Sequence, residues 1–358
     1  MNVFCKAPWN SIHVRMDGSV FPCCISNYCI GTLQESTWEE IQNGDRMKEL
    51  KEGFITFDSK ILSYCKKCSL CTEGSSRLRY NNIPEGKLDI DIRVSNKCNL
   101  TCRMCSPWAS SAWERETGQD GKTMNSTLRK QLIQTVKDKA PFVKNLTLVG
   151  GEPTLIREYY DILEYYVQQG YAQNVELIFN TNLQQFPKKF YDLCSNFKVV
   201  HMCMSIDALG EVGEVIRTGS SWKIVNKNVL KALDYRKRYP NFELCITPTV
   251  SVLNILYLDD LYQYGKERNI DVSGDNILFD PKELCIGYFS SRVKEKIKTS
   301  LLKSVYIPNQ FVCKVINYLD ETDSLEKFDT KSYVYIKKIA PNYYRVAEST
   351  NKMLQSLV

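Results

Sequence analysis

The chain has 358 residues, of which 43% are hydrophobic and 25% charged. This length is enough for about two or three domains, and the balance is ordinary for a folded protein. No apolar run approaches the roughly 20 residues that cross a membrane, and the first residues lack a signal-peptide core, so we expect a cytoplasmic protein. The net charge of +6 is a weak sign of an anionic partner. Dense basic patches with interleaved aromatic residues are missing, which disfavours nucleic-acid binding.

Cysteine is unusually frequent, with 15 residues, whereas there are only two histidines, His13 and His201. Paired cysteines are typical of small secreted domains, and this chain is long and shows no secretion signal. Metal binding is therefore the better explanation of the cysteines. The scarcity of histidine argues against a histidine-rich catalytic zinc site and favours metal chemistry based on sulfur.

The first cysteine-rich segment contains a predicted hairpin. Ser11 to Phe21 alternates loosely in hydrophobicity around Asp17-Gly18, a pair that favours a tight turn between two strands. Two such strands would bring Cys5 and Cys23 to one end of the hairpin.

A second group of cysteines, Cys65-x2-Cys68 followed by Cys71, comes after a helix-like stretch from Trp38 to Leu50. The hairpin pair and a distant CxxC together predict a site of four thiolates. By spacing alone, a zinc ribbon and an iron–sulfur cluster are equally good interpretations.

Three more cysteines, Cys98, Cys102 and Cys105, follow a predicted strand, Leu88 to Ser95, with the spacing CxxxCxxC. A closed structural zinc site has four ligands, so three local thiolates leave one metal position open. A cubane iron–sulfur cluster with one open iron fits this count, since soft sulfur ligands suit iron–sulfur as well as zinc. Zinc with a distant fourth ligand is the alternative.

Strands and helices alternate from Lys87 to Leu284, which indicates parallel β/α units. The predicted strands are Leu88–Ser95, Leu146–Val149, Val175–Phe179, Val199–Ile206, Leu244–Val250 and Ile277–Phe279. Predicted helices include Ser106–Thr117 and Ser126–Lys139, with Ser126 as the N-cap. From Ile286 onward the chain looks helical and then becomes rich in tyrosine and lysine, and we interpret these tyrosines mainly as packing residues.

Polar and glycine residues gather where these strands end. Gly150-Gly151-Glu152-Pro153 follows the second strand, Asn182 the third, and Ser205 and Asp207 the fourth. In barrels of parallel strands, chemistry gathers at the carboxyl ends of the strands. The strand ends therefore predict a site independently of the cysteines.

The stretch from Val94 to Cys105 resembles the signature loop of radical S-adenosylmethionine (SAM) enzymes. This resemblance implies that Cys98, Cys102 and Cys105 hold a 4Fe–4S cluster whose open iron chelates SAM. The family cleaves SAM reductively to a 5′-deoxyadenosyl radical, which abstracts hydrogen from substrate. Met104 occupies the place where the family's backbone contacts adenine.

The same resemblance extends to the strand ends. Gly150 to Pro153 resembles the family's GGE motif, whose carboxylate accepts hydrogen bonds from the ammonium of SAM. Arg217 matches an arginine that pairs with the SAM carboxylate. Asp207 would contact SAM or cap the next helix. The implied cofactor-binding residues are Met104, Gly150, Gly151, Glu152, Pro153, Asn182, Ser205, Asp207, Arg217, Val252 and Asn254.

The N-terminal segment resembles the twitch or SPASM element of radical SAM proteins, here placed before the barrel. The features that carry this resemblance are Cys5…Gly18-x4-Cys23, Pro8-Trp9, Gly31-Thr32-Leu33 and Cys65-x2-Cys68. It implies one auxiliary 4Fe–4S cluster with Cys5, Cys23, Cys65 and Cys68 as ligands. Cys24 is an alternative to Cys23, and Cys71 an alternative to Cys68.

The fold that the resemblance implies is α/β, a partial (β/α)6 radical SAM barrel preceded by a small cysteine-rich twitch-like domain with a β-hairpin. We expect a twitch-like domain over residues 1–80, the barrel over 85–285 and a mainly helical extension over 286–358. No side chain stands out as a general acid or base, because in this family the homolytic step belongs to the cofactor.

The resemblance implies radical modification of a peptide or protein as the first interpretation. The same chemistry on a carbohydrate or a nucleotide-linked small molecule comes second. An external electron donor such as flavodoxin or ferredoxin would be a partner. An alternative of another class is a non-enzymatic protein with two zinc sites whose basic tail binds RNA or DNA, although it does not explain Gly150 to Pro153 or Arg217.

Overall fold

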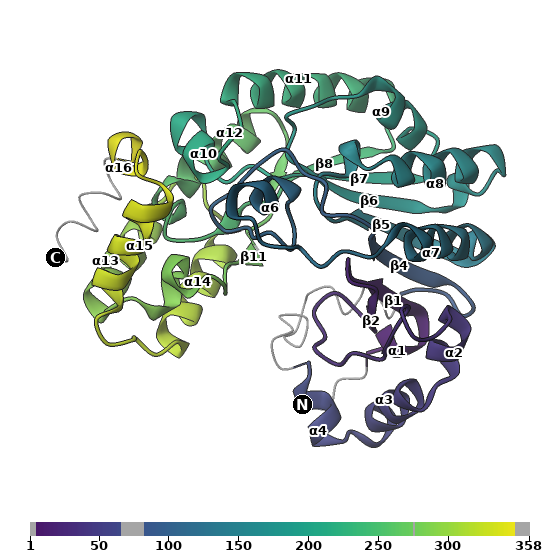
Figure 1. The fold of residues 1–358 in the computed structure, drawn as a ribbon. Coiled ribbons are helices and arrows are strands. Elements are labelled where there is room, and N and C mark those ends of the chain that lie inside the picture. Colours follow the sequence, from purple (N-terminus) through teal and green to yellow (C-terminus); the bar gives the residue numbers. More distant parts are fainter. Residues whose placement is uncertain (1–4, 66–81, 275, 348–358) are drawn as a thin grey trace. The chain divides into compact units, whose positions relative to one another are not determined.

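The computed structural model describes residues 5–65, 82–274 and 276–347 (Figure 1). The chain divides into two compact units. The first comprises Met1–Cys98, Pro107–Asn180 and Pro187–His201, and the second comprises Asn99–Ser106, Thr181–Phe186 and Met202–Val358. The division at residues 1–80, 85–285 and 286–358 follows sequence motifs and stays a prediction.

The predicted N-terminal hairpin is confirmed. After the short helix α1 (Ala7–Asn10), strands β1 (Ser11–Val14) and β2 (Ser19–Phe21) pair antiparallel, and β3 (Gly31–Thr32) adds a third strand. Strand β1 also pairs in parallel with β4 (Leu88–Arg93). The cysteine-rich segment therefore contributes a strand to the main sheet, which the sequence did not predict.

The helix-like stretch from Trp38 to Leu50 is two helices, α2 (Trp38–Asn43) and α3 (Asp45–Thr56), followed by α4 (Ser59–Ser63). A capping box begins α2, in which Thr37 accepts from the Glu40 N–H and the Glu40 carboxylate accepts from the Thr37 N–H. Gly44 between the helices is extended, with φ −72° and ψ 164°, which separates them.

The rest of the first unit is a parallel sheet with helices between its strands. Strands β4, β5 (Val143–Val149) and β6 (Glu176–Thr181) pair side by side in parallel, as predicted. The helices are α6 (Ser111–Thr117), α7 (Ser126–Asp138), α8 (Arg157–Gln168) and α9 (Lys188–Cys194), with short 3₁₀ turns η2 (Ala140–Phe142), η3 (Pro153–Leu155) and η4 (Ala172–Asn174). The Asn125 side chain caps α7 by accepting from the Leu128 N–H, so the prediction of Ser126 as N-cap was wrong by one residue.

The second unit continues the alternation of strands and helices. Strand β7 (Val199–Met204) is divided between the two units after His201. Strand β8 (Phe242–Ile246) pairs in parallel with β10 (Asp271–Val272). Strand β9 (Thr249–Val250) pairs in parallel with β11 (Asn276–Ile277). The strand predicted over Leu244 to Val250 is thus two strands. Pro248 lies between them and has no N–H for a ladder. The strand predicted at Ile277 to Phe279 joins β9, and β10 was not predicted.

The remaining elements of the second unit are helical, and those after Ile286 confirm the prediction of a helical segment there, for the described residues. They are α10 (Gly210–Ile216), α11 (Trp222–Arg238), η5 (Ile255–Tyr257), α12 (Leu258–Glu267), η6 (Lys282–Leu284), η7 (Ile286–Tyr288), α13 (Ser291–Leu302), α14 (Asn309–Glu321), α15 (Phe328–Ile339) and α16 (Tyr343–Val346). Tyr343 is buried, and its hydroxyl donates to the Leu253 carbonyl. This tyrosine packs, as interpreted from the sequence. Among the described residues, no helix combines the length and apolar character that a membrane crossing needs.

Tyr159 on α8 ties together the ends of two neighbouring strands. Its side chain is fully buried, and its hydroxyl lies 3.0 Å from the Ile92 carbonyl and also contacts the Val149 carbonyl. The hydroxyl accepts from the Val94 N–H at 3.3 Å. Burial raises the pKa of this phenol, so it remains a neutral donor. One phenol therefore supports the backbone just before the cysteine loop.

We expect Tyr159→Phe to lower the free energy of unfolding by about 1–3 kcal/mol, because buried backbone groups would lose their partner. Tyr160→Phe on the same helix is the control, since the Tyr160 hydroxyl contacts only the Thr154 carbonyl and is half-buried. Its effect should be about 1 kcal/mol or less. Urea denaturation measures both, and equal losses would contradict the bridging role.

Candidate functional site

Cys98 is held by the first turn of α6. Its backbone N–H donates to the Ser111 hydroxyl at 3.1 Å, and that hydroxyl donates to the Cys98 carbonyl at 3.2 Å. The Ser111 N–H donates to the Asn96 carbonyl, and the Asn96 amide donates to Pro107. These contacts all lie in the first unit. They fix the backbone on which the Cys98 thiol is carried.

The two glycines after β5 lie directly against the backbone that leads to Cys98. The Gly151 N–H donates to the Ser95 carbonyl at 3.0 Å, and the Glu152 N–H donates to the Lys97 carbonyl at 2.8 Å. A Cβ on Gly150 would come within 2.5 Å of the Ser95 oxygen, and one on Gly151 within 2.2 Å of the Lys97 oxygen. Only glycine allows this approach, since Cβ atoms do not come closer than about 3.0 Å.

Glu152 is buried at this strand end. One carboxylate oxygen accepts from the Thr154 N–H at 3.2 Å and from the Thr154 hydroxyl at 2.7 Å, at the start of the 3₁₀ turn η3. Pro153 occupies the first position of that turn, where its missing N–H costs nothing. The GGEP motif thus serves as a turn and as a backbone ladder beside Cys98.

In the second unit, the rest of the cysteine loop lies on the segment after α10. The Thr101 N–H donates to the Thr218 carbonyl at 2.9 Å, and the Arg103 N–H donates to the Ile216 carbonyl at 2.8 Å. The Asn182 amide, at the end of β6, donates to the Asn99 side chain at 2.9 Å. The backbone around Cys102 is therefore positioned by two separate strand-end and helix-end segments.

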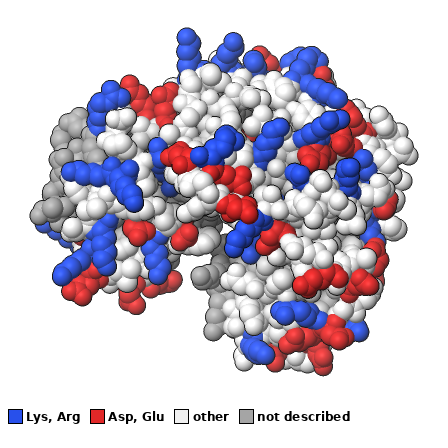
Figure 2. Space-filling model, in the orientation of Figure 1, with Lys and Arg blue, Asp and Glu red and all other residues white. Residues whose placement is uncertain are grey.

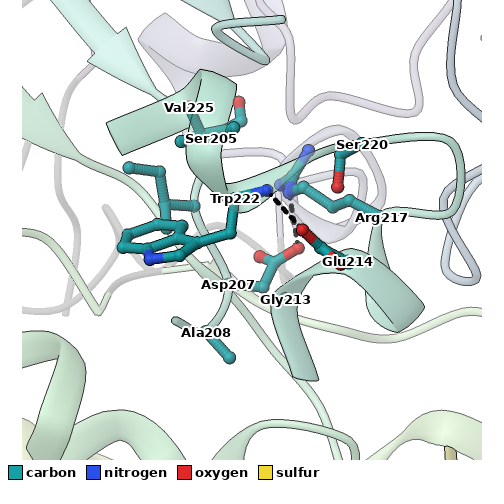
Figure 3. Close-up of a pocket in the computed structure, with 10 residues that line it drawn as sticks. Ser205, Asp207, Ala208, Gly213, Glu214, Arg217, Ser220, Trp222 and Val225 are labelled. Atoms are coloured by element: carbon teal, nitrogen blue, oxygen red, sulfur yellow. Dashed lines mark hydrogen bonds and ion pairs between the residues drawn. The ribbon is translucent and has the colours of Figure 1, made fainter. Parts of the chain in front are cut away.

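Asp207 and Arg217 form a buried ion pair next to Cys102. Arg217 Nε lies 2.7 Å from Asp207 Oδ2, and Arg217 Nη1 lies 3.9 Å from Cys102 Sγ. Figure 3 shows the two charged side chains joined by a dashed line in the lining of a small pocket. The residues that line this pocket are Ser205, Ile206, Asp207, Ala208, Gly213, Glu214, Arg217, Ser220, Trp222 and Val225.

The guanidinium of Arg217 stays charged. Burial alone would lower its pKa, but the charges of Asp207 and of the Cys102 thiolate outweigh burial and raise the pKa above its usual value. A permanent cation beside a thiolate suits an anionic sulfur cluster and an anionic ligand equally. The structure thus brings together Ser205, Asp207 and Arg217 of the predicted site and places Cys102 beside them.

Asp207 does not cap the following helix. Residue Leu209 stands at the N-cap of α10 and makes no side-chain cap, whereas the second Asp207 oxygen accepts from the Thr249 N–H at 2.7 Å. The capping role considered for Asp207 is therefore wrong. Its carboxylate is occupied by Arg217 and by the backbone of β9.

Asn254 and Val252 lie behind this pair. The Asn254 amide is fully buried and donates to the carbonyls of Asp207 and Thr249, both at 3.0 Å, and its oxygen accepts from the Ser251 N–H. The Val252 N–H donates to the Leu284 carbonyl. Asn254 thus positions Asp207, and the binding of cofactor by Asn254 and Val252 stays a prediction. Met104 is half-buried in the cysteine loop.

Two of the predicted auxiliary ligands meet in the first unit. Cys5 packs against a small cluster that contains Cys23 and Ala7. Burial raises the pKa of the Cys23 thiol, while hydrogen bonds from the backbone N–H groups of Ile25 and Ser26 oppose this shift. Amide donors of this kind stabilise a thiolate once it is formed.

The other auxiliary cysteines are only partly described. Cys65 follows α4, Cys24 is exposed, and Cys68 and Cys71 lie outside the described residues. None of the described cysteines forms a disulfide. Cys98 belongs to the first unit, and Cys102 and Cys105 to the second. Among the described residues no three cysteine, histidine or carboxylate side chains are grouped as a metal site. The ligand sets stay predictions that the thiol chemistry fits.

Two residues of this site were not singled out from the sequence, Ser111 and Asn99. A serine at a helix start and an asparagine between cysteines are common in any chain. Their proximity to the cysteines in the sequence was the one available indication, and proximity in sequence does not predict the hydrogen bonds of Ser111 with Cys98 or of Asn99 with Asn182.

Two sequence profiles match the chain. That of the radical SAM superfamily matches residues 92–263. That of SPASM, an iron–sulfur cluster-binding domain, matches residues 5–72. An uncharacterized protein of Methanocaldococcus jannaschii is 22% identical over 253 residues, which are 70% of this chain and 79% of that protein.

Solved structures resemble the chain at low identity. Native anSMEcpe with bound AdoMet is 22% identical, with 66% of this chain and 62% of that chain covered and a TM-score of 0.43. Streptococcus suis SuiB is 14% identical, with 80% of this chain and 62% of that chain covered and a TM-score of 0.43. The chain spans less than two thirds of these proteins.

We expect Gly151→Ala to displace the backbone before Cys98 and to lower the iron that the cysteine loop retains after reconstitution, because the new Cβ would overlap the Lys97 oxygen. Gly170→Ala is the control, since a Cβ there meets open space and only its φ of +74° is strained. Iron analysis of both variants, with thermal unfolding as a check of folding, tests this. Equal iron loss in both would contradict a local effect.

We expect Arg217→Gln to lower the free energy of unfolding by about 3–5 kcal/mol, because the Asp207 carboxylate would stay buried without its counter-charge. The double variant Asp207→Asn/Arg217→Gln should recover part of that loss, since no unpaired charge remains. Urea denaturation of the wild type, of Asp207→Asn, of Arg217→Gln and of the double variant measures the coupling. A double variant no more stable than Arg217→Gln would show that the pair is not the source of the loss.

Proposed function

The chain belongs to the radical SAM superfamily and carries a SPASM-type iron–sulfur domain before its barrel, and from this premise we propose that it modifies a peptide or protein substrate. It is an enzyme whose cofactors are SAM, a 4Fe–4S cluster and an auxiliary iron–sulfur cluster. When bound, the cluster and SAM supply a radical that abstracts hydrogen from substrate. The protein's own task is to bind, orient and exclude water.

The observation that supports the proposed use of SAM is the charged pair beside Cys102. Arg217 is held by Asp207 with its Nη1 toward Cys102, so a fixed guanidinium fork lies where an anionic ligand of the cluster would bind. We assign it to the carboxylate of SAM. Glu152 and the glycines before it would receive the ammonium group, and Ser205 and Asn182 would supply hydroxyl and amide contacts.

We propose Cys98, Cys102 and Cys105 as the ligands of the SAM-binding cluster. We propose Cys5, Cys23, Cys65 and Cys68 as the ligands of one auxiliary cluster. The packing of Cys5 with Cys23 and the amide donors at Cys23 support the second set. An external reductant such as flavodoxin or ferredoxin would deliver the electron.

A peptide substrate is favoured because radical SAM proteins with twitch or SPASM elements mainly act on peptides. A carbohydrate or nucleotide-linked small molecule is the second choice on the same ground. Figure 2 shows Lys and Arg side chains interspersed with Asp and Glu on the face in view. This mixture does not favour the alternative in which a basic surface binds nucleic acid.

We expect the triple variant Cys98→Ala/Cys102→Ala/Cys105→Ala, purified anaerobically, to form no 5′-deoxyadenosine from SAM and dithionite. It should hold about four irons in place of about eight, because a 4Fe–4S cluster at the N-terminal cysteines would remain. Cys203→Ala on β7 is the control and should behave as the wild type. Iron analysis and mass spectrometry of the nucleoside measure both quantities.

Continued production of 5′-deoxyadenosine by the triple variant would overturn the ligand assignment. A colourless wild-type protein with stoichiometric zinc would overturn the proposed function itself. The substrate class is tested separately, by incubating active enzyme with small peptides encoded by neighbouring genes and following their mass. A mass change in such a peptide supports the proposal, and a change only in a sugar or nucleotide would overturn the peptide assignment.

A further inference from the structure

Two arginines meet at the edge of the first unit where β1 and β4 end. The parallel register pairs Val14 with Ile92, so that Arg15, the next residue after β1, lies opposite Arg93, the last residue of β4. Figure 1 shows the two strands side by side. Because the strands are parallel, both arginines lie at their carboxyl ends. This is the edge from which the chain continues to Cys98.

Each guanidinium lies over an aromatic ring. Arg15 Cζ is 3.7 Å from the ring centroid of Phe21, and Arg93 Cζ is 5.3 Å from that of Trp108. Stacking of this kind holds the plane of a guanidinium and leaves the N–H groups at its edge available. Both arginines are half-buried, while Trp108 is 37% exposed. The pair is therefore preorganised and reachable from outside.

Among the residues that the structure describes, no carboxylate forms an ion pair with either guanidinium. Within the described part of the chain, no ion pair or side-chain hydrogen bond joins either guanidinium to another residue, and Arg93 Nε is buried without a partner. Asp91, on the same face of β4, is already paired with His13, whose Nδ1 lies 3.1 Å from Asp91 Oδ2. Asp17 lies near Arg15 and offsets part of its charge, since it opposes the lowering of the Arg15 pKa, but its Oδ1 accepts from the Ser19 N–H and it makes no ion pair with Arg15.

The two like charges oppose each other. Burial lowers the pKa of Arg15, and the charge of Arg93 lowers it further. A fold does not gain from placing two half-buried cations at adjacent register positions without a carboxylate between them. An arrangement that disfavours the unliganded state is typical of a binding site, where a ligand of opposite charge removes the repulsion.

We propose that Arg15 and Arg93 form a binding site for an oxyanion of the substrate, the carboxylate of an acidic side chain or of a chain terminus being the first candidate and a phosphate the second. Two guanidinium forks match the two oxygens of a carboxylate. The site rests on the proposed function in one respect, since the peptide that would supply the carboxylate is itself proposed. It would place an acidic group of that peptide at the carboxyl ends of β1 and β4 in the first unit, from which the chain continues to Cys98.

The test uses the full chain with its clusters loaded and oxidised, so that no radical chemistry intervenes. The probes are acetyl-Ala-Ala-Asp amide, acetyl-Ala-Ala-Ala with a free carboxylate, acetyl-Ala-Ala-Asn amide as the neutral match, and inorganic phosphate. We expect calorimetry to show at least tenfold weaker binding of the neutral peptide than of a charged one. In the variant Arg15→Gln/Arg93→Gln, the affinity for the charged peptides should fall to the affinity for the neutral peptide.

Arg238→Gln is the matched control. Arg238 also lies over an aromatic ring, with Cζ 4.7 Å from the Tyr235 centroid, but on the exposed end of α11. This variant removes one positive charge outside the proposed site and should keep the wild-type affinity. Thermal unfolding without probe provides a second readout, because removal of one repelling cation should leave the melting temperature of Arg93→Gln unchanged or higher. Arg15→Lys/Arg93→Lys keeps the charge without the forks and should bind with intermediate affinity.

Equal binding of the Asp and Asn peptides with no response to phosphate would overturn the site, as would undiminished binding by Arg15→Gln/Arg93→Gln. Binding of phosphate but not of either carboxylate would support the site and assign it to a phosphorylated substrate. Formation of 5′-deoxyadenosine by the wild type without peptide is measured separately. If the wild type forms no 5′-deoxyadenosine, the proposed function is wrong. The oxyanion site is tested by the peptide and phosphate binding measurements alone.

Discussion

The carboxylate of Asp207 is fully buried, and the candidate site in the second unit depends on how that charge is compensated. A buried carboxylate is unfavourable unless it is paired and hydrogen-bonded. Arg217 provides the counter-charge and the Thr249 N–H provides the hydrogen bond, while Asn254 fixes the backbone behind Asp207. Because Arg217 also faces Cys102, one electrostatic requirement of the fold sets the position of a cation beside the cysteine loop.

The two parts of the cysteine loop are held in the same way, through backbone groups. In the first unit the loop begins against Gly151, which has no Cβ to keep the chains apart. In the second unit Thr101 and Arg103 donate to the segment next to Arg217. In each unit, backbone contacts with a neighbouring segment therefore fix part of the main chain that carries the cysteines.

Much of the site could be predicted from sequence because its signals are local. The cysteine spacing, the glycines after a strand and the polar residues at strand ends need no knowledge of distant contacts, and the α/β alternation follows from periodicity. The pairing of Asp207 with Arg217 was not predicted, since the two residues are separated by a helix and either could have served another role. The prediction of one strand from Leu244 to Val250 did not take account of Pro248, whose missing N–H interrupts the ladder.

The parallel pairing of β1 with β4 is the feature that sequence reasoning could least supply. Its partners are far apart in the chain and a hairpin needs no third strand to explain its pattern, so nothing local specifies the contact. Once the pairing exists, its register has a chemical consequence. A shift by one residue would turn His13 away from Asp91 and Arg15 away from Arg93, because side chains alternate between the faces of a sheet. The buried pair of His13 and Asp91 therefore favours the register that also sets two arginines side by side, so that the contact which joins the cysteine-rich segment to the sheet determines where the uncompensated charge lies.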